Sequence, residues 1–378
     1  MSKPLKIGIL GYSLNAVEQK LELEKNKLLE GLTKFIVGFD PDENAQGRLG
    51  KLESVKVAKS FEDFLDTSEL QAVLINSPPQ YHAEQAIAAL ESGLHVFSEI
   101  PMALKSEDLE RVVSAEEDSG KIYQLGENYC FIPEILYAGH LSSSNLIGEP
   151  VYAEAEYLHD VTYRWREGAK GDVDTPRVDS WYQLFDPLMY AHSIGPAQVA
   201  LGGLDNPMPF IEVVSYANDL GGYQGKPICA PAKAFQVALF RTETSAIAKC
   251  ANAYKFAREP TRISIQIIGN TGAYECNQIG FPGRQYITDG HLITRSRHRK
   301  GKRSKIDKDF LSELIPHVDG DHFGADVRVL HDWLISIQNN KKPSIPAKIG
   351  ANFCMAGIAA SKSARSGGKP MEIKIYTD

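Results

Sequence analysis

The segment IGILGYSLNA, residues 7–16, decides how the first part of this chain folds. It begins as a short apolar run, typical of a strand buried in a parallel sheet, turns at a glycine and continues as a helix. The dinucleotide-binding fingerprint Gly-x-Gly-x-x-Gly/Ala has this form. Gly11 makes the tight turn, Ser13 stands where the backbone approaches a pyrophosphate, and Ala16 is small enough for the helix to pack on the strand. The predicted cofactor contacts of this loop are Gly11, Tyr12, Ser13 and Leu14.

A second element of the fingerprint stands at the end of the next predicted strand, residues 34–40. Asp40 closes this strand, at the position where a carboxylate binds the adenosine ribose hydroxyls in this class of fold. Residues 41–43, Pro-Asp-Glu, bring no arginine that would neutralise a 2′-phosphate, so the pattern favours NAD over NADP. The alternative is a parallel α/β domain without a nucleotide, in which Asp40 only caps a turn.

Strand-like and helical segments alternate through the first 130 residues. Apolar runs typical of buried strands cover 5–11, 34–40, 70–79, 94–101 and 121–129, and helical patterns cover 15–32, 82–93 and 106–120. The last of these helices carries acids in its first turn and ends at Gly120. Strand–helix repetition at this spacing predicts a parallel sheet covered by helices on both faces, a Rossmann dinucleotide-binding domain over residues 1–130.

The pattern changes after residue 145. Strand-like runs with period-two alternation cover 149–165, 210–218, 234–242, 245–254, 262–270, 272–277 and 285–290, and helical segments cover 131–143, 186–202, 321–340 and 347–366. Neighbouring strands joined by short polar turns are typical of an antiparallel sheet. We therefore predict an α/β chain whose C-terminal α+β domain, residues 131–378, has an open, mostly antiparallel sheet for substrate binding and oligomerisation.

Length and composition limit the function classes. The chain has 378 residues, 43% of them apolar and 24% charged, which suits two globular domains. Its net charge of −7 argues against a general nucleic-acid surface, and no apolar run approaches the roughly 20 residues that a membrane helix needs. Five scattered cysteines without a CxxC pair, and a start that runs directly into a strand, predict a cytoplasmic protein with free thiols and no metal. The basic stretch 291–308 is interpreted as a solvated loop, with a phosphate or acidic-polymer contact as the alternative.

Residues 75–103, INSPPQYHAEQAIAALESGLHVFSEIPMA, resemble the Gfo/Idh/MocA oxidoreductases, the family of glucose-fructose oxidoreductase and inositol dehydrogenase. Residues 343–373 are similar to the closing helix and strand of the same family. The resemblance implies that both ends of the segment 76–100 lie against the cofactor. The residues so implied are Asn76, Ser77, Pro78, His82, Glu99 and Ile100. For His82, a role as a helix cap is the alternative.

Two positions depart from the family pattern. Ile100 stands where the family has a lysine beside the nicotinamide and the substrate. His192 matches the family histidine, but the aspartate expected four residues earlier is Leu188, and Asp186 lies two residues further upstream. We predict His192, with the neighbouring Tyr190, as the acid/base pair of the site, since histidine titrates near neutral pH. A buried helix histidine bonded to a carbonyl is the alternative.

Four further segments are similar to one branch of this family, the NAD-dependent glycoside hydrolases of the N-acetylgalactosaminidase type. They are ENYCF at 127–131, YLHD at 157–160, YRWR at 163–166 and HSIGP at 192–196. The branch also has an apolar residue at the position of Ile100, but its tyrosine three residues before the histidine is Met189 here. Tyr157 and His159 share one strand face by period two, and we predict that they contact the substrate, with packing over the helix layer as the alternative. Asn128 and Tyr129 follow the last strand of the first domain and are predicted to contact the cofactor and the substrate, respectively. Trp165 and Arg166 are predicted cofactor contacts, with plain packing as the alternative.

The predicted function is hydride transfer between NAD and a sugar, polyol or glycoside. One candidate reaction is reversible dehydrogenation, which forms NADH. The other is redox-neutral glycoside cleavage, in which a 3-keto intermediate acidifies the C2 proton, its removal expels the C1 substituent, and NAD stays bound. A non-catalytic sugar or dinucleotide sensor on the same fold is the third alternative, favoured by the loss of the lysine and the aspartate. The open face of the second sheet predicts a homodimer or homotetramer.

Overall fold

The computed structural model describes residues 3–12, 23, 25–52, 54–159, 185–218, 234–253, 261–281, 283–287, 302–305 and 317–377. The chain divides into two compact units, each with a sheet of its own. The first unit comprises 1–131, 318–354 and 376–378, and the second comprises 132–317 and 355–375. The first unit thus includes a segment, 318–354, that lies far beyond the boundary expected at residue 130.

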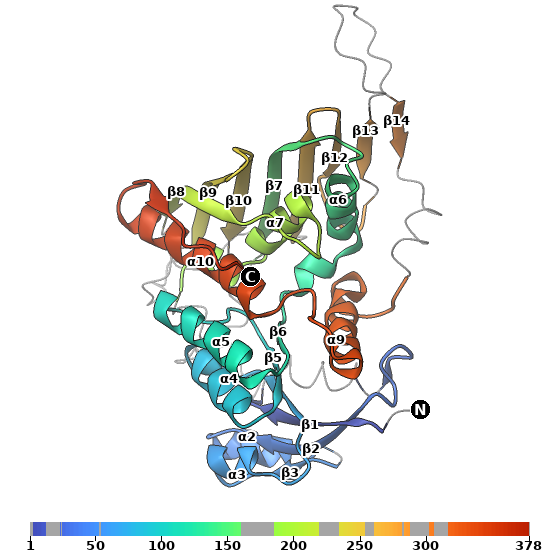
Figure 1. Ribbon diagram of the computed structural model, residues 1–378, viewed down its shortest axis with the longest axis vertical. Coiled ribbons are helices and arrows are strands. Elements are labelled where there is room, and N and C mark those ends of the chain that lie inside the picture. The colour runs from blue at the N-terminus through green and yellow to red at the C-terminus, as the bar shows by residue number, and fades with distance from the viewer. Residues whose placement is uncertain are drawn as a thin grey trace, which may run out of the picture. The chain divides into compact units, whose positions relative to one another are not determined.

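The sheet of the first unit has the order β3-β2-β1-β4-β5-β6, and all of its described pairs are parallel (Figure 1). Its strands are β1 (Leu5–Leu10), β2 (Thr33–Phe39), β3 (Lys56–Val57), β4 (Ala72–Ile75), β5 (His95–Ser98) and β6 (Tyr123–Leu125). Between successive strands stand α2 (Glu43–Leu49), α3 (Phe61–Leu65), α4 (His82–Glu91) and α5 (Ser106–Ser119). The predicted Rossmann domain is confirmed, and the strand order reverses between β1 and β4.

The apolar runs of the sequence form the buried strands of this sheet. Ile7, Ile9 and Leu10 are inaccessible to solvent, and so is every residue of β4. Burial of both sheet faces explains why these strands are continuously apolar rather than alternating. Helix α5 buries residues three or four positions apart and ends at Gly120, whose φ of +62° costs a glycine nothing sterically.

Several segments of the first unit differ from the sequence prediction. β4, β5 and β6 end earlier than expected, and residues 128–131 form a 3₁₀ helix, η2 (Asn128–Phe131). The helix predicted over 15–32 lies largely outside the described residues, and 27–31 form turns. The helix expected at 321–340 is α9 (Asp321–Asn339), which packs on η2. A strand ends where its neighbour stops pairing, and a single sequence does not encode that point.

Glu116 of α5 joins three elements of the first unit. Its Oε1 accepts the main-chain N–H of Tyr123 in β6 at 3.0 Å, and its Oε2 accepts that of Ala347 at 2.9 Å. Ala347 begins α10 (Ala347–Arg365). Burial raises the pKa of the Glu116 carboxyl to about 7, although the two N–H groups oppose the rise. Between about pH 4.5 and pH 7, the carboxyl of Glu116 is therefore protonated in the folded chain and ionised in the unfolded chain.

We expect the Glu116→Gln variant to become more stable, relative to wild type, as the pH rises. Because the folded pKa is raised, the contribution of Glu116 to stability is full below its unfolded pKa and is lost as the pH rises through its folded pKa. The difference in unfolding free energy should shift by about 3 kcal/mol in favour of the variant between mildly acidic and mildly alkaline pH. Urea unfolding followed by circular dichroism measures this difference.

Glu117→Gln is the matched control for this experiment. Glu117 lies on the same helix, its side chain is 54% exposed, and it pairs with Lys348 at 2.8 Å. An exposed acid of this kind should shift the stability difference by less than about 0.5 kcal/mol over the same pH range. Equal shifts for the two variants would contradict the assignment of a buried, protonated Glu116.

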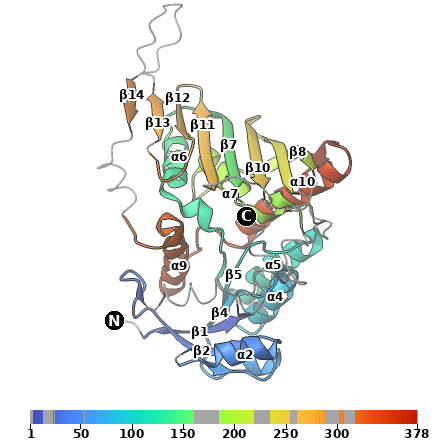
Figure 2. The same cartoon turned by 180° about the vertical axis from the view of Figure 1, so that it is seen from behind.

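The second unit is built on a mixed sheet in the order β14-β13-β12-β11-β7-β10-β9-β8-β15 (Figures 1 and 2). Its strands are β7 (Pro150–Leu158), β8 (Phe210–Asn218), β9 (Phe235–Thr242), β10 (Ile247–Ala253), β11 (Arg262–Gly269), β12 (Gly272–Cys276), β13 (Arg284–Ile287), β14 (Lys302–Lys305) and β15 (Met371–Glu372). β7 and β10 are parallel and the other described pairs are antiparallel, which confirms the mostly antiparallel prediction. One face of this sheet is covered by α6 (Pro133–Ser143), α7 (Ile194–Gly202) and the C-terminal half of α10.

Two predicted segments of this unit end differently. The strand expected over 149–165 ends at Leu158, and residues 160–165 lie outside the described part of the chain. Within the basic stretch 291–308, which was predicted as a loop, residues 302–305 form β14 and pair with β13. Strand pairing therefore orders part of a segment whose charge alone suggested a solvated loop.

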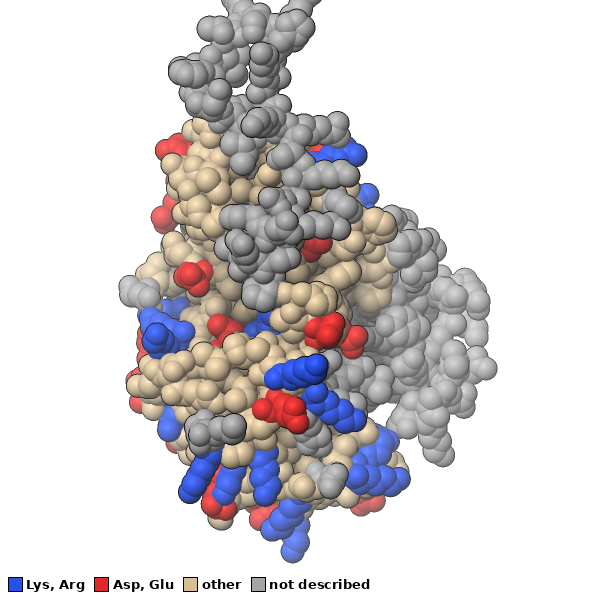
Figure 3. All heavy atoms as spheres, turned by 90° about the vertical axis from the view of Figure 1, so that its right-hand side faces the viewer, with Lys and Arg blue, Asp and Glu red and all other residues tan. Residues whose placement is uncertain are grey.

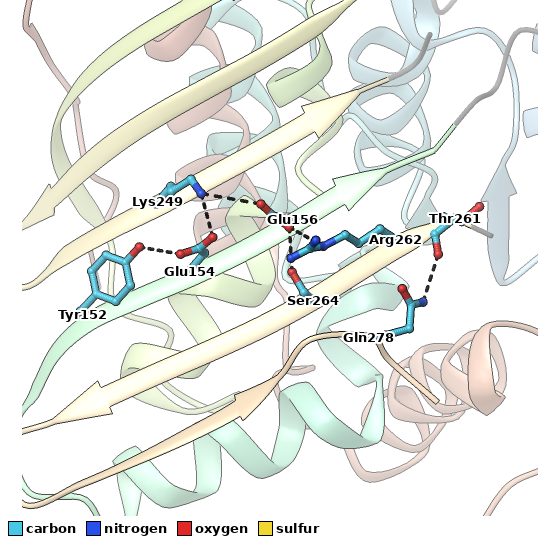
Figure 4. Close-up of polar contacts among 8 residues, drawn as sticks. All are labelled: Tyr152, Glu154, Glu156, Lys249, Thr261, Arg262, Ser264 and Gln278. Carbon is cyan, nitrogen blue, oxygen red and sulfur yellow. Dashed lines mark hydrogen bonds and ion pairs between the residues drawn. The ribbon is translucent and has the colours of Figure 1, made fainter. Parts of the chain in front are cut away.

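The other face of this sheet carries a row of ion pairs (Figure 4). Nζ of Lys249 in β10 lies 2.8 Å from Oε1 of Glu154 and 3.7 Å from Oε1 of Glu156, both in β7. Nε of Arg262 in β11 lies 2.8 Å from Oε2 of Glu156. Since the three strands are neighbours, these charges form cross-strand pairs, which stabilise a sheet modestly.

Beside this row, the same face becomes apolar. Tyr216, Leu239 and Ile247, on β8, β9 and β10, are 65%, 53% and 47% exposed. Leu239 stands opposite Lys249 in the β9–β10 register, which places both side chains on one face. On the described part of the face that Figure 3 shows, both basic and acidic side chains are present.

Candidate active site

The predicted cofactor residues of the first unit gather at the carboxyl edge of its parallel sheet. Gly11 and Tyr12 follow β1, Asp40 follows β2, Asn76 and Ser77 follow β4, Glu99 and Ile100 follow β5, and Asn128 follows β6. Ligands of open α/β sheets bind outside this edge, at the point where the strand order reverses. The structure therefore brings these residues, distant in sequence, to one edge around β1 and β4.

Gly11 lies where two loops approach each other through their main chains. It has a φ of +82°, and its N–H donates to the carbonyl of Phe39 at 2.9 Å. A Cβ at this position would lie 2.5 Å from the main-chain nitrogen of Ser77 and 2.6 Å from its Cα. Only glycine fits, because both the backbone conformation and the available space exclude a side chain.

The main chains at Gly11 and Ser77 form a narrow cradle, and Asp40 lies beside it, directly after β2. Its Oδ2 accepts the N–H of Tyr12 at 2.8 Å, and its Oδ1 accepts the N–H of Asp42 at 2.9 Å. Each carboxylate oxygen has two acceptor positions, so both retain one for a ribose hydroxyl. The glycine cradle and this carboxylate fit the pyrophosphate and the adenosine ribose of a dinucleotide.

Arg48 belongs to the same edge and was not predicted from the sequence. Its guanidinium carbon lies 4.8 Å from the centre of the Tyr12 ring, which is a cation–π distance. The prediction that no arginine would neutralise a 2′-phosphate beside Asp40 rested on residues 41–43, which follow Asp40 directly. Arg48, in the last turn of α2, instead places a positive charge beside Tyr12 in the loop after β1. The sequence signal for Arg48 was its position in the last turn of the helix that follows the second strand.

His82 connects two of the loops at this edge. Its Nδ1 lies 2.8 Å from the carbonyl oxygen of Pro101, and its Nε2 lies 2.7 Å from that of Ser77. The ring is buried, and burial lowers its pKa although these carbonyls oppose the effect. The residue begins α4 without a side-chain cap, so its ring supports the loops after β4 and β5 from within. A direct contact between His82 and the cofactor stays a prediction.

Ile100 is buried, with 3% of its surface exposed, and its peptide bond to Pro101 is cis. The loop after β5 is held by Glu99, whose N–H donates to the carbonyl of Ile75 in β4 at 3.0 Å. An apolar side chain therefore occupies the position where the resemblance implies a lysine. The loop therefore offers no ammonium group at this point.

Asn128 and Tyr129 begin η2, directly after β6. Nδ2 of Asn128 donates to Oδ1 of Asp326 in α9, and Oδ2 of the same carboxylate lies 2.8 Å from Nδ1 of His322. The ring centres of His322 and Tyr129 are 5.6 Å apart, and Tyr129 is buried. Asp326 and His322 were not predicted from the sequence, where only their i, i+4 spacing on a helix could have indicated the pair.

Four predicted site residues of the second unit form one cluster, all of it packed against Tyr157 of β7. The ring of His192 lies 4.8 Å from that of Tyr157 and 4.4 Å from that of Tyr190, both in edge-to-face geometry. The Tyr157 hydroxyl lies 2.8 Å from Nδ1 of His159. Tyr157, Tyr190 and His192 are 4%, 5% and 7% exposed. The cluster therefore combines two imidazoles and two phenols in a largely buried environment.

The backbone that carries His192 is not the continuous helix predicted over 186–202. It forms a 3₁₀ turn, η5 (Pro187–Tyr190), then turns at Ala191 with a φ of +63°, and α7 starts at Ile194. On one helix, residues 190 and 192 would point about 200° apart. The break at Ala191 lets their rings meet.

Tertiary contacts hold this turn in place. Nδ2 of Asn252 in β10 donates to the carbonyl of Pro187 at 2.8 Å, and Oε1 of Gln236 in β9 accepts the N–H of Leu188 at 3.1 Å. A Cβ on Gly357 of α10 would lie 2.7 Å from the carbonyl oxygen of Leu188. These contacts come from distant segments of the chain, so the local pattern of 186–202 could not indicate them.

Asp186 is committed to a structural ion pair. Its carboxylate is fully buried, accepts the hydroxyl of Ser361, and lies 2.9 Å from Nε and 2.8 Å from Nη2 of Arg365. Such a bidentate pair satisfies the carboxylate within the protein. Leu188, at the family position of the aspartate, is buried and apolar.

Several predicted positions cannot be placed. Ser13, Leu14, Trp165 and Arg166 lie outside the described residues. Pro78 precedes a short 3₁₀ helix, η1 (Pro79–Tyr81), at the edge already described. Among the described residues, no helix is long and apolar enough to cross a membrane, and no group of three or more His, Cys, Asp or Glu side chains could hold a metal ion.

Comparison with protein families identifies the first unit. Residues 5–127 match the model of the Gfo/Idh/MocA family, described as an oxidoreductase family with an NAD-binding Rossmann fold. This match confirms the predicted family and NAD as the cofactor of the domain. It covers the strands β1–β6 and every described edge residue from Gly11 to Glu99.

Curated relatives match a smaller part of the chain. A glycosyl hydrolase family 109 protein of Shewanella baltica is 33% identical over 108 residues, which is 29% of this chain and 24% of that protein. An alpha-N-acetylgalactosaminidase of Shewanella oneidensis is 31% identical over 108 residues, with the same coverage. The chain thus spans about a quarter of the length of these relatives.

Solved structures match the fold over nearly the full length. An oxidoreductase domain protein from Kribbella flavida covers 99% of this chain and 100% of its own, with a TM-score of 0.77 and 20% identity. A levoglucosan dehydrogenase in complex with NADH and L-sorbose gives the same coverage, a TM-score of 0.75 and 16% identity. Residues 5–127 therefore form an NAD-binding Rossmann domain of the Gfo/Idh/MocA oxidoreductase type.

Proposed function

We propose that this chain is an NAD-dependent enzyme that acts on a sugar, polyol or glycoside by hydride transfer, with His192 as the acid/base. The observation that carries the proposal is the buried cluster of His192, Tyr190, Tyr157 and His159. It provides proton-transfer groups in a family whose usual lysine position is Ile100 here. Structures of the same fold include a sugar dehydrogenase, and sequence relatives of part of the chain include glycosidases.

The chemistry of the cluster suits the oxidation of a carbinol. NAD, when bound, supplies the acceptor for the hydride that leaves carbon. His192 takes the hydroxyl proton, because a neutral imidazole is a base near neutral pH. The phenol of Tyr157 shares a proton with Nδ1 of His159, so a second group can donate or accept a proton at the substrate. Edge-to-face contacts with Tyr157 and Tyr190 hold the His192 ring in one orientation.

Redox-neutral glycoside cleavage is the second candidate reaction. It needs separate groups for the hydroxyl proton at C3 and the carbon-bound proton at C2, and the cluster contains two histidines and two tyrosines. The apolar Ile100 and the family 109 relatives support this version. Those relatives are matched over only a quarter of their length, so their substrate is not transferred to this chain.

The following experiment separates the candidate functions. The protein is purified without added nucleotide and denatured, and the released molecules are identified by mass spectrometry. The native protein is then incubated with NAD and a panel of sugars, polyols and aryl glycosides. Net NADH formation supports the dehydrogenase, and release of an aryl leaving group without net NADH supports glycoside cleavage. Neither product on any substrate, with NAD or a sugar still bound, would contradict the enzyme and favour a sensor.

We further propose that the apolar part of the open sheet face, formed by Tyr216, Leu239 and Ile247, is covered by a second copy of the chain. Exposed apolar side chains gathered on one flat face are typical of protein interfaces. Light scattering at micromolar concentration should give a dimer or tetramer. Leu239→Glu should shift the mass towards a monomer, whereas Leu146→Glu, at a 41% exposed site after α6, should not. A monomeric wild type would contradict this proposal.

A further inference from the structure

The start of α9 contains three consecutive residues in the left-handed region. His322, Phe323 and Gly324 have φ values of +49°, +61° and +76°. For a residue other than glycine, this conformation costs roughly 1–2 kcal/mol. Strain of this kind persists where the surrounding structure imposes it, and it concentrates at functional sites. The contacts of these residues must therefore offset the cost of the backbone, and the side chain of His322 makes one of them.

The surroundings of the three residues fix their conformation. Arg328 donates from Nη1 to the carbonyl of Phe323 at 2.9 Å, and the N–H of Gly324 donates to the carbonyl of Gly320 at 3.1 Å. A Cβ on Gly324 would lie 2.2 Å from the carbonyl oxygen of Val318. The turn is therefore specific, and its result is that Nδ1 of His322 faces Oδ2 of Asp326 at 2.8 Å.

Asp326 uses its other oxygen on Asn128. Nδ2 of Asn128 donates to Oδ1 of Asp326, so the carboxylate receives a donor on each side. A carboxylate only accepts hydrogen bonds, which decides the orientation of the Asn128 amide: its nitrogen faces Asp326 and its oxygen faces the other way. A side-chain amide without such a partner can rotate and present either group.

Asn128 occupies the half of the sheet edge that corresponds to the nicotinamide end of NAD. In the proposed cofactor site, the pyrophosphate lies at Gly11, after β1, and the adenosine ribose lies at Asp40, after β2. A dinucleotide that crosses the switch point from β2 and β1 continues towards β4, β5 and β6. Asn128 follows β6, at the far end of this direction. The donor groups of that half of NAD are the hydroxyls of its ribose and the carboxamide N–H.

We propose that Asp326, supported by His322, is a positioning residue that orients the amide of Asn128 so that its oxygen accepts a hydrogen bond from the nicotinamide half of NAD. The inference rests on the proposed function and on the cofactor contact that the sequence analysis predicts for Asn128. It adds two residues of the C-terminal part of the chain, on α9, to the machinery of the Rossmann unit. Neither residue touches the cofactor in this assignment.

The test compares two nucleotides on protein stripped of bound cofactor. NAD contains the nicotinamide half, and ADP contains only the half that Gly11 and Asp40 hold. In Asp326→Asn, the amide oxygen keeps the N–H of His322 Nδ1 and the amide nitrogen takes the place of Oδ1. The Asn128 amide then turns its oxygen towards residue 326 and presents its nitrogen. We expect NAD affinity, measured by calorimetry, to fall about tenfold while ADP affinity stays unchanged. ADP-ribose, which keeps the ribose and lacks the carboxamide, identifies which donor is lost.

A second variant tests the orientation itself. In the double variant Asn128→Asp with Asp326→Asn, the amide and the carboxylate exchange places, and residue 128 again presents an acceptor oxygen. NAD affinity should recover to within about threefold of wild type. Loss in Asp326→Asn without recovery in the double variant would overturn the proposed orientation, and so would unchanged NAD affinity in Asp326→Asn.

The matched control is Asp332→Asn. Asp332 lies on the same helix and also accepts two hydrogen bonds, from the N–H and hydroxyl of Ser344 at 2.8 and 2.9 Å. It should leave the affinities for both nucleotides unchanged. An equal fall of NAD and ADP affinity in Asp326→Asn would indicate a merely structural tie and overturn the inference. A wild type that bound neither nucleotide would instead contradict the proposed function.

Discussion

The His192→Ala variant is expected to lose about 10²–10⁴-fold in turnover of whichever substrate the screen identifies, while its affinity for NAD stays unchanged. His192 lies in the second unit, packed against Tyr157 and Tyr190, and the nucleotide cradle belongs to the first unit. A group that moves a proton in the transition state affects kcat and kcat/KM alike. Steady-state kinetics and NAD calorimetry on the same preparation measure both quantities.

His140→Ala provides the matched control for this prediction. His140 lies in α6 of the same unit, where its Nδ1 is 3.2 Å from the hydroxyl of Ser144, and it takes no part in the cluster. Its replacement should leave turnover within about twofold. Unchanged turnover in His192→Ala would show that this residue is a buried packing histidine. A larger loss in Tyr157→Phe than in His192→Ala would assign the acid/base to the Tyr157–His159 pair instead.

The Gly11→Ala variant is expected to lose NAD binding, with at least a hundredfold weaker affinity, because its methyl group fills the cradle. The new Cβ would lie 2.5 Å from the main-chain nitrogen of Ser77, and the backbone at φ +82° is unfavourable for alanine. Separation of the loops after β1 and β4 by the overlap should cost about 1–3 kcal/mol beyond the backbone strain. Calorimetry with NAD and thermal unfolding measure the two effects.

Gly120→Ala separates these two causes. Gly120 has a φ of +62°, but a Cβ there would meet no heavy atom within 4 Å. This variant should therefore show the backbone strain alone, roughly 1–2 kcal/mol, and bind NAD as wild type does. If Gly11→Ala bound NAD normally, the cradle between Gly11 and Ser77 would not be the pyrophosphate site.

The Rossmann unit could be predicted from the sequence because its elements are specified locally. Each buried parallel strand is a continuous apolar run, each connection returns at a glycine or polar turn, and the right-handed crossover rule leaves few topologies. The position of Gly11 and Asp40 at one edge follows from this alternation alone. The resemblance of residues 75–103 then located the loops after β4 and β5, where His82 and Ile100 stand.

The cluster around His192 depended on contacts that the sequence does not display. The residues were predicted, but the helix assumed over 186–202 would have turned Tyr190 and His192 apart. Asn252, Gln236 and Gly357 impose the 3₁₀ turn and the left-handed Ala191, and all three come from segments more than 40 residues away. Apolar periodicity cannot reveal such a break, since the whole segment is buried and reads as helix.

The sequence by itself determined the parallel sheet and its cofactor edge, because strand burial and turn chemistry act over neighbouring positions. It also provided the residues of the cluster around His192, although not their arrangement. Only the tertiary structure decided that Asp186 pairs with Arg365, that Arg48 returns to Tyr12, and that α9 brings Asp326 to Asn128. In each case a charged side chain is satisfied by a group that lies close in space. The cost of leaving a charge without a partner selects that contact from the folded arrangement, which a local pattern cannot anticipate.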